Sequence, residues 1–310
     1  MTRLLTGDPL GWVLGRPSAV AIGVFDGVHL GHRIVLAELV EEALARSLVP
    51  VALTFDPHPL EFLAPDRAPR LLTDIDRRAE LLGRCGVEVV GVLPFLQIRD
   101  LAPEAFAVEV LAGRLEARVV AVGADFRFGY GRSGDVDALR ALGDRLGFEV
   151  EPVELVGHSD GEVVSSSRIR AMLEEGRVAE AARLLGEPFQ IRGPVVHGDS
   201  RGRGIGFPTA NLHVPERMAL PGNGVYAARA RLGDQTHRSV VNIGVRPTFG
   251  QTQRVVEAHL LDVDLDLYGS VLSLGFVDRL RDERRFAGVD ELVAQIARDV
   301  EAGRQVLADA

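Results

Sequence analysis

The pattern of apolar and polar positions divides the chain into two parts. In the first part, short apolar runs alternate with segments whose apolar residues recur at helical spacing. The strand-like runs are 18–25, 49–55, 87–95 and 117–123, and the helix-like segments lie at about 31–46, 74–84, 103–114 and 135–146. Strands separated by helices indicate a parallel sheet covered on both faces. Thr73 is a candidate cap for the helix at 74–84, and Pro103 suits the first turn of the next.

After about residue 186 the pattern changes to short strand candidates separated by Gly, Pro and Asn. These candidates are 189–198, 225–232, 237–244, 254–261 and 271–280, and a strongly helical segment follows at 289–307. Such a pattern is typical of an antiparallel barrel or sandwich closed by a C-terminal helix. The segment GEPFQ at 186–190 is the expected join, which predicts domains at 1–186 and 187–310.

Composition restricts the chemistry that these domains could perform. The chain has 310 residues, is 46% hydrophobic and carries a net charge of −9, which argues against a general nucleic-acid binder. It contains no lysine, so Schiff-base lysines and P-loop lysines are excluded. Asp8 and Pro9 interrupt the N-terminus before a signal peptide could develop, and no apolar run reaches the roughly 20 residues of a membrane span. The single cysteine, Cys85, supports a cytoplasmic location.

The stretch GVFDGVHLGH, residues 23–32, lies between the first apolar run and the first helical segment. His29 and His32 therefore fall at a strand-to-helix turn, where unpaired N–H groups and the helix dipole favour an anion. Ligands of parallel sheets bind beyond the carboxyl ends of the strands, where this turn lies. Gly31 would let the backbone approach a phosphate closely.

The residue types alone leave three interpretations of these histidines open. They could bind a metal, with His58 of TFDPHP as a third ligand, or they could be structural. The third interpretation is an H-x-G-H motif that contacts the triphosphate of ATP and stabilises charge on a phosphoryl group under attack. The position at the start of a nucleotide-binding fold favours the third.

Two further segments of the first half suit a nucleotide site. In SSSRIR, residues 165–170, hydroxyls and an arginine precede a helical segment, which indicates an anion site or, alternatively, an ordinary serine cap. The glycine-rich loop 123–135 carries aromatic side chains that suit stacking on a planar ring, unless the loop folds over them. An early H-x-G-H and a late phosphate-binding helix start occur in this order in nucleotidyl transferases. Class I aminoacyl-tRNA synthetases share the layout, but their late motif depends on lysine.

The second half carries a glycine-rich loop in GDSRGRGIGFPTANL, residues 198–212, which ends in a predicted Pro-Thr-Ala-Asn turn at 208–211. Its amides could wrap phosphates, although the segment is not a Walker A loop and could be a simple hairpin. Thr209 and Asn211 offer oxygen atoms of the kind that Mg²⁺ accepts. Alternation along 254–261 places Glu257 on the face opposite its apolar neighbours. Periodicity favours the solvent side, but a Glu257 that faced Thr209 and Asn211 could accept a proton from an alcohol attacking a γ-phosphate.

Taken together, these segments closely resemble bacterial bifunctional FAD synthetase, in which riboflavin kinase is fused to FMN adenylyltransferase. The resemblance covers nearly the whole chain, in family order, through GVFDGVHLGH, TFDPHP, GADFRFG, SSSRIR, RGRGIGFPTAN, NGVY, NIGVRPTFG, VEAHLLD and LYG. It implies an α/β Rossmann-like nucleotidyltransferase domain followed by an all-β six-stranded antiparallel barrel with a C-terminal helix. The implied substrates and products are ATP, riboflavin, FMN and FAD, with Mg²⁺ as cofactor.

The resemblance also implies roles for individual residues. In the adenylyltransferase it makes His29 and His32 catalytic, and it assigns ATP binding to Gly23, Phe25, Asp26, Gly31, Ser165, Ser166, Ser167 and Arg168 and flavin binding to Phe62, Asp125, Phe126 and Phe128. Asp26 could instead serve only to form the turn, and Ser167 replaces the threonine usual in the family. Tyr130 stands where many members carry a basic residue.

In the kinase, the resemblance makes Glu257 the catalytic base that acts on the ribityl 5′-hydroxyl. Thr209 and Asn211 would hold the metal, and the implied ATP-binding residues are Gly198, Arg201, Gly202, Arg203, Gly206 and Pro208. The rival hypotheses are a nucleotidyl transferase for another substrate, a flavin-binding sensor without catalysis, and a zinc protein. The sequence leaves open whether the protein is a homo-oligomer.

Overall fold

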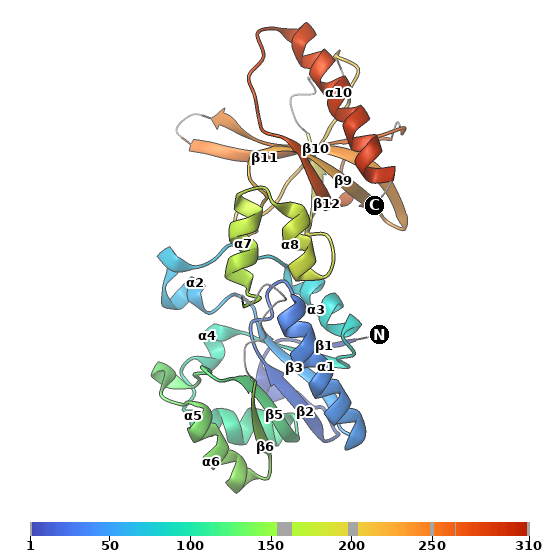
Figure 1. Cartoon of the computed structure of the whole chain (residues 1–310). Helices are drawn as coiled ribbons and strands as arrows, with labels where there is room; N and C mark the ends of the chain where they lie inside the picture. The colour runs from blue at the N-terminus through green and yellow to red at the C-terminus, as the bar shows by residue number, and fades with distance from the viewer. Residues whose placement is uncertain (1, 154–162, 198–203, 249–250, 264, 309–310) are drawn as a thin grey trace. The chain divides into compact units, whose positions relative to one another are not determined.

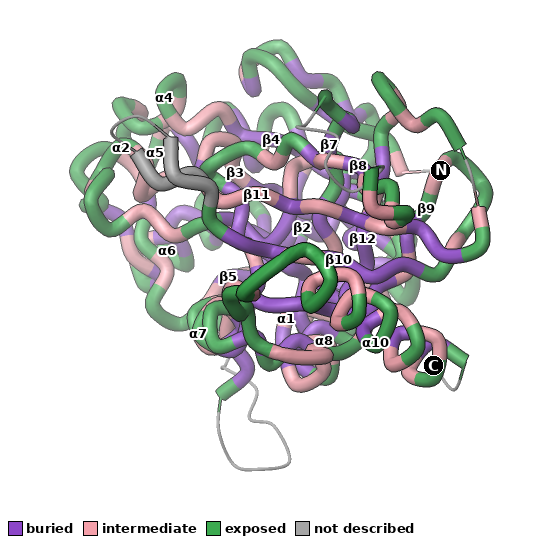
Figure 2. The backbone as a smooth tube through the Cα atoms, turned by 90° about the horizontal axis from the view of Figure 1, so that it is seen from above, coloured by how far each residue is buried: buried purple, intermediate pink, exposed green. Residues whose placement is uncertain are grey.

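The computed structural model describes residues 2–153, 163–197, 204–248, 251–263 and 265–308. The chain forms two compact units (Figure 1). Unit 1 comprises Met1–Pro69 and Thr73–Ser165, and unit 2 comprises Arg70–Leu72 and Ser166–Ala310. In both units the central strands are buried while the helices carry exposed stretches (Figure 2).

Unit 1 is built on a six-stranded parallel sheet with the order β1-β4-β3-β2-β5-β6. Its strands are β1 (Arg3–Leu5), β2 (Ser18–Ile22), β3 (Val49–Phe55), β4 (Val89–Leu93), β5 (Ala117–Gly123) and β6 (Glu149–Val153). Because β2 to β5 are almost entirely buried, they consist of continuous apolar runs, as expected for strands covered on both faces.

Helices cover both faces of this sheet. The helices of unit 1 are α1 (Leu30–Ala45), α2 (Leu60–Leu63), α3 (Ile75–Arg84), α4 (Phe95–Ile98), α5 (Pro103–Ala105) with its π-helical continuation η3 (Phe106–Arg114), and α6 (Val136–Leu146). Short 3₁₀ turns occur at Pro9–Gly11, Pro65–Arg67 and Tyr130–Arg132. α1 and α3 pack on one face, and η3 and α6 pack on the other. The Rossmann-like arrangement is confirmed.

The strand order creates a switch point beside β2. From β2 the chain adds β3 and β4 on one side, and then returns to place β5 on the other side. The turn that carries His29 follows β2, and the aromatic loop follows β5. Two motifs about 90 residues apart in sequence therefore leave neighbouring strands at the edge where open α/β sheets bind ligands.

Unit 2 contains a closed antiparallel barrel with the order β10-β11-β8-β7-β12-β9. Its strands are β7 (Gln190–Val196), β8 (Ala210–Leu212), β9 (Gly224–Leu232), β10 (Gln235–Thr248), β11 (Gln251–Leu260) and β12 (Val271–Arg281). The C-terminal helix α10 (Val289–Ala308) packs on the barrel, where Gly303 lies against Val240. The barrel and its helix are confirmed.

Two helices precede the barrel, α7 (Ser166–Glu174) and α8 (Val178–Leu185). They belong to unit 2, together with Arg70–Leu72, where Leu71 forms a parallel bridge to Met218. The compact units thus divide at Ser165, whereas the sequence predicts functional domains at 1–186 and 187–310. That functional boundary stays a prediction.

Two local predictions were wrong. β8 falls in the Pro-Thr-Ala-Asn segment, for which the sequence predicts a turn; this short strand gains its stability from pairing with both β7 and β11. Thr73 does not cap α3, because the cap is Asp74, whose side chain accepts a hydrogen bond from the Arg77 backbone N–H at 2.8 Å. The side chain of Thr73 instead contacts Asp26.

Candidate active sites

The turn after β2 has a strained backbone. Phe25, Gly27 and Val28 have φ values of 51°, 85° and 39°. A left-handed conformation is rare for a β-branched residue such as Val28, and it costs on the order of 1–3 kcal/mol. Strain of this kind persists only where surrounding contacts hold it, and it concentrates at functional sites.

His29 and His32 are brought together by the start of α1. His29 is the N-cap, and its Nδ1 accepts a hydrogen bond from the His32 backbone N–H at 3.3 Å. A neutral His29 therefore carries its ring proton on Nε2. The two imidazole rings stack with centroids 3.7 Å apart and planes inclined by 14°. A Cβ at Gly31 would lie 3.3 Å from the His29 ring, so glycine preserves this stack.

The environment of His32 keeps its imidazole uncharged. Burial lowers its pKa well below 6.5, and the neighbouring His29 and Arg78 lower it further. Its Nδ1 is buried, and it has no hydrogen-bond partner among the residues that the structure describes. A buried polar atom without a partner is unfavourable, so this nitrogen suits a polar atom of a ligand.

The hydrogen bonds and the ion pair described for Asp26 are with other residues of unit 1. Asp26 is 1% exposed, and its Oδ1 accepts hydrogen bonds from the Thr73 backbone N–H at 3.0 Å and from the Thr73 hydroxyl at 3.2 Å. The Arg78 guanidinium lies 3.7 Å away. These contacts match the turn-forming alternative, while its predicted contact with ATP stays a prediction.

The late SSSRIR motif is divided between the two units. Ser165 ends unit 1, where the carbonyl oxygen of its neighbour Val164 lies 3.5 Å from the position that a Gly31 Cβ would occupy. The start of the motif therefore lies beside the H-x-G-H turn. Ser166, Ser167 and Arg168 form the first turn of α7 in unit 2.

The residues predicted to surround a flavin differ in accessibility. Phe128 is 7% exposed and packs in the unit 1 core, so the loop does fold over this ring. Phe126 stacks on Phe128 with centroids 5.5 Å apart. Asp125 is exposed, and Phe62 is 37% exposed and lies over the Phe95 ring. Phe62 and Asp125 are thus the accessible members of the set.

A metal site built on His58 is not supported. His58 is buried, and its Nδ1 accepts a hydrogen bond from the Leu60 backbone N–H at 3.1 Å. Within the described part of the chain, no group of three or more His, Cys, Asp or Glu side chains lies close enough to hold a metal ion.

Unit 2 contains a cavity of about 450 Å³ with a row of polar side chains on its wall. The row crosses three strands, because Glu257 on β11 lies opposite Asn211 on β8 and opposite Asn242 on β10. Thr209, two residues before Asn211, lines the same cavity. Glu257 is half-buried on the face opposite the buried Val256 and Ala258, and it lines the same cavity as Thr209 and Asn211; its role as a base stays a prediction.

The rest of this cavity is largely apolar and is bordered on one side by α10. Its apolar lining includes Ile205, Phe207, Val255, Phe286, Leu292 and Ile296. Arg281 and Asp299 form a bidentate ion pair in its wall, with the shortest N–O distance at 2.7 Å, and Gln295 donates to the same carboxylate. A cavity of this size and lining suits a planar, drug-sized ligand.

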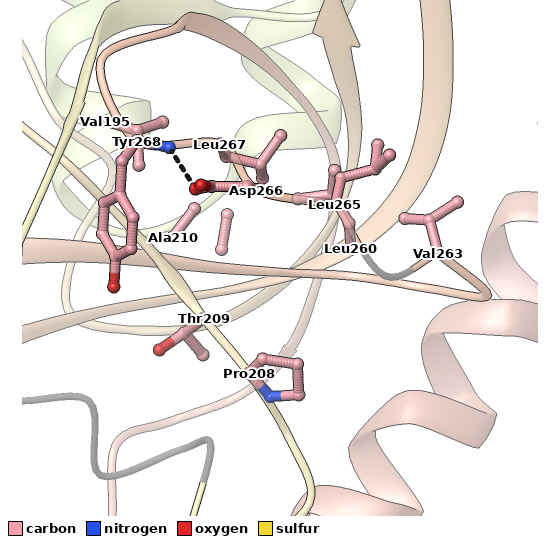
Figure 3. Close-up of a pocket in the computed structure, with 11 residues that line it drawn as sticks. Val195, Pro208, Thr209, Ala210, Leu260, Val263, Leu265, Asp266, Leu267 and Tyr268 are labelled. Carbon is pink, nitrogen blue, oxygen red and sulfur yellow. Dashed lines mark hydrogen bonds between the residues drawn. The ribbon is translucent and has the colours of Figure 1, made fainter.

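A smaller cavity of about 70 Å³ lies next to Thr209, which lines both cavities. Thr209, Pro208 and Tyr268 border it, together with apolar residues of β11 and the loop that follows (Figure 3). The Tyr268 ring stacks on His197 with centroids 3.9 Å apart. His259 Nδ1 lies 2.7 Å from the Pro208 carbonyl oxygen and so holds this segment against β11.

Of the residues predicted to bind ATP in the kinase, Gly206 and Pro208 are described and precede β8, and Gly206 has a φ of 86°. Gly198, Arg201, Gly202 and Arg203 lie outside the described residues.

Sequence reasoning missed Asn242 and the Arg281–Asp299 pair. Strand register alone could have identified Asn242, because pairing β10 with β11 places it opposite Glu257. The ion pair joins residues 18 positions apart through the packing of α10, which no local pattern reveals.

The comparisons with known proteins agree with this arrangement. Residues 14–168 match the family model described as FAD synthetase, and residues 185–307 match the one described as riboflavin kinase. The chain is 42% identical over 288 residues to the bifunctional riboflavin kinase/FMN adenylyltransferase of Escherichia coli (strain K12), covering 92% of this chain and 91% of that protein. It is 40% identical to the Pseudomonas fluorescens protein of the same name over 295 residues, with 94% of each covered.

A solved structure is similar over nearly the whole chain. It is described as a macrolide-efflux protein from Streptococcus pneumoniae, with a TM-score of 0.86, 32% identity and 98% of each chain covered. Among the helices described here, none is both long and apolar enough to cross a membrane. On the sequence identity and coverage of the relatives and on both family models, the chain belongs to the bifunctional riboflavin kinase/FMN adenylyltransferase family.

Proposed function

We propose that the C-terminal site phosphorylates riboflavin to FMN and that the N-terminal site transfers AMP from ATP to FMN. The observation that carries the kinase assignment is the polar row of Asn211, Glu257 and Asn242 on the wall of a cavity that also has a large apolar lining. The stacked histidines at the sheet's switch point support the second activity. Both reactions transfer phosphorus to an oxygen nucleophile, so positioning and charge neutralisation are the main requirements.

In the kinase, riboflavin would occupy the larger cavity and the nucleotide would reach Thr209 from the smaller one. The apolar lining near α10 suits the isoalloxazine ring, and the ribityl chain would extend toward Glu257. Glu257 accepts the proton of the 5′-hydroxyl while the hydroxyl oxygen attacks the γ-phosphorus of ATP. ADP then leaves with the electrons of the broken P–O bond.

The metal proposed for this site is Mg²⁺. Thr209 and Asn211 supply hydroxyl and amide oxygens on one wall of the cavity, and magnesium commonly combines few protein ligands with substrate phosphates. When bound, the ion would neutralise charge on the transferred phosphoryl group. A location in the cytoplasm also remains part of the proposal, on the ground of the single cysteine.

At the N-terminal site, an oxygen of the FMN phosphate attacks the α-phosphorus of ATP and pyrophosphate leaves. His29, with its proton on Nε2, and His32, with its buried Nδ1, would contact the triphosphate. Negative charge of the nucleotide favours the protonated form of His32, so binding would draw a proton onto a ring that is neutral in the free enzyme. The accessible Phe62 and Asp125 would contact the flavin.

The test is to incubate the purified protein with riboflavin, ATP and Mg²⁺ and to separate the flavins by chromatography. FMN that appears first and is then converted to FAD supports both assignments. A protein that forms FMN without FAD contradicts the N-terminal assignment. A folded protein that leaves riboflavin unmodified, yet converts supplied FMN to FAD, contradicts the C-terminal assignment.

A further inference from the structure

Arg78 is a buried cation next to the turn after β2, residues 24–29, which is called the histidine turn below. It lies on α3 and is 2% exposed. Its guanidinium donates to the Thr54 hydroxyl at 3.0 Å, to the Phe55 carbonyl at 3.0 Å and to the Thr73 carbonyl at 3.2 Å; its Nε also donates to the Thr73 hydroxyl at 3.4 Å. Arg78 thus connects the end of β3 to the segment before α3 through one planar group.

Each hydroxyl that accepts a hydrogen bond from Arg78 also donates one to a residue of the turn after β2. The Thr54 hydroxyl donates to the Val24 carbonyl at 2.7 Å. The Thr73 hydroxyl donates to Asp26 at 3.2 Å and accepts from the Gly27 backbone N–H at 3.1 Å. A guanidinium has donors only, so each hydroxyl must direct its single hydrogen away from Arg78 and toward the turn.

The turn needs such support because its backbone is strained. Phe25 and Val28 adopt positive φ values on either side of Asp26 and Gly27, and His29 follows directly. A relaxation of this strain would rotate His29 out of its position as the cap of α1 and would break its stack with His32.

We propose that Arg78 is a positioning residue for adenylyl transfer: through Thr54 and Thr73 it holds the strained turn in the conformation that presents His29 and His32 to the nucleotide. This inference rests on the proposed role of the histidine turn. It assigns Arg78 no contact with the substrate: its loss acts on the geometry of the reacting groups and also removes a charge that lowers the pKa of His32, which Arg78→Lys keeps. Misplacing reacting groups by about 1 Å lowers the rate about 100-fold.

The test compares three variants of the full-length protein. Arg78→Met keeps the length of the side chain but removes all donors, and Arg78→Lys restores the charge and three donors. Arg77→Met is the matched control, since Arg77 is 8% exposed on the same helix but pairs with Glu80. Steady-state kinetics with supplied FMN give kcat and KM for adenylyl transfer, and riboflavin kinase activity is the internal control. Trp12, buried in unit 1, reports by its fluorescence whether unit 1 is folded.

For folded Arg78→Met we expect kcat of adenylyl transfer to fall about 100-fold, with KM for FMN and kinase activity within about threefold of the wild type. Arg78→Lys should recover most of the loss, and Arg77→Met should show none. A folded methionine variant with wild-type kcat, or a lysine variant no better than methionine, overturns the inference.

If Arg78→Met fails to fold, Thr73→Val replaces it, because valine keeps the shape of threonine and removes its hydroxyl. A folded Thr73→Val protein should lose about tenfold in kcat of adenylyl transfer, and a wild-type kcat overturns the inference. His29→Ala distinguishes a failure of the proposed histidine site from a failure of the role proposed for Arg78. If that variant keeps full adenylyltransferase activity, the proposed histidine site itself is wrong; if it is inactive while Arg78→Met is unimpaired, Arg78 alone has been misassigned.

Discussion

Glu257 on β11 lies directly opposite Asn211 on β8, on the wall of the larger cavity of unit 2. Side chains opposite each other on one face of antiparallel strands have Cβ atoms about 5 Å apart. A carboxylate at this distance from the amide of Asn211 and near Thr209 can take the proton of an alcohol held between them.

We therefore expect Glu257→Gln to lower FMN formation by about 100-fold or more, the range for loss of a general base. Initial rates with riboflavin and ATP give this value. Conversion of supplied FMN to FAD should stay at the wild-type rate, because His29 and His32 of the second site lie in unit 1. Loss of both activities in a folded variant would contradict the two-site proposal.

Gly31 offers a test of the histidine stack. An alanine Cβ there would lie 3.3 Å from atoms of the His29 ring, so the ring must shift. We expect Gly31→Ala to lower kcat/KM for FAD formation about tenfold and to leave the kinase unchanged. Gly11→Ala is the control, since a Cβ at Gly11 has no heavy atom within 4 Å. Equal rates for the two variants would show that the stacked arrangement is not required.

Much of the fold could be predicted because its signals are local. β3 and β5 have the predicted bounds, since continuous apolar runs bounded by polar residues identify buried parallel strands. Pro103 begins a helix as expected. β8 could not be found in this way, because three residues carry no periodicity and pairing with distant strands decides their conformation.

Part of the geometry of the candidate sites could also be predicted, while the roles of their residues stay predictions. His29, His32, Thr209, Asn211 and Glu257 were identified from motifs, and the structure brings each set together within its own unit. Arg78 was not identified, since an arginine on a helix resembles any solvated charge until the packing of α3 buries it. Phe128 illustrates the reverse case: its loop suggested an exposed ring, but packing against the sheet buries it.

The lowered pKa of His32 predicts a pH dependence of stability. Its native pKa lies below the unfolded value of 6.5, so below pH 6.5 the unfolded chain binds a proton that the native state does not. His32 therefore lowers the stability of unit 1 as the pH falls below 6.5. The loss is up to about 1.4 kcal/mol per pH unit until the native pKa is reached, and above pH 6.5 His32 has no effect on stability.

Urea unfolding followed by Trp12 fluorescence measures this effect, since Trp12 lies in the core of unit 1. Between pH 7.5 and pH 5.5, the free energy of unfolding should fall by about 1 kcal/mol more in the wild type than in His32→Gln. Taking the difference between the two proteins cancels the contribution of other titrating groups. Parallel losses in both would mean that His32 is protonated as easily in the native protein as in the unfolded chain.

The Arg281–Asp299 pair predicts how α10 supports the kinase. Asp299 is 5% exposed and accepts hydrogen bonds from two nitrogens of Arg281, while Leu292 and Ile296 of the same helix line the cavity. Removing one partner of a buried ion pair costs about 3 kcal/mol, because the other charge is left uncompensated. Asp299→Asn should lower the temperature at which kinase activity is lost by several degrees and raise KM for riboflavin. Asp262→Asn is the control, since Asp262 pairs with Arg304 of α10 at the surface and should change neither value. If both variants behave alike, α10 is not held by the buried pair.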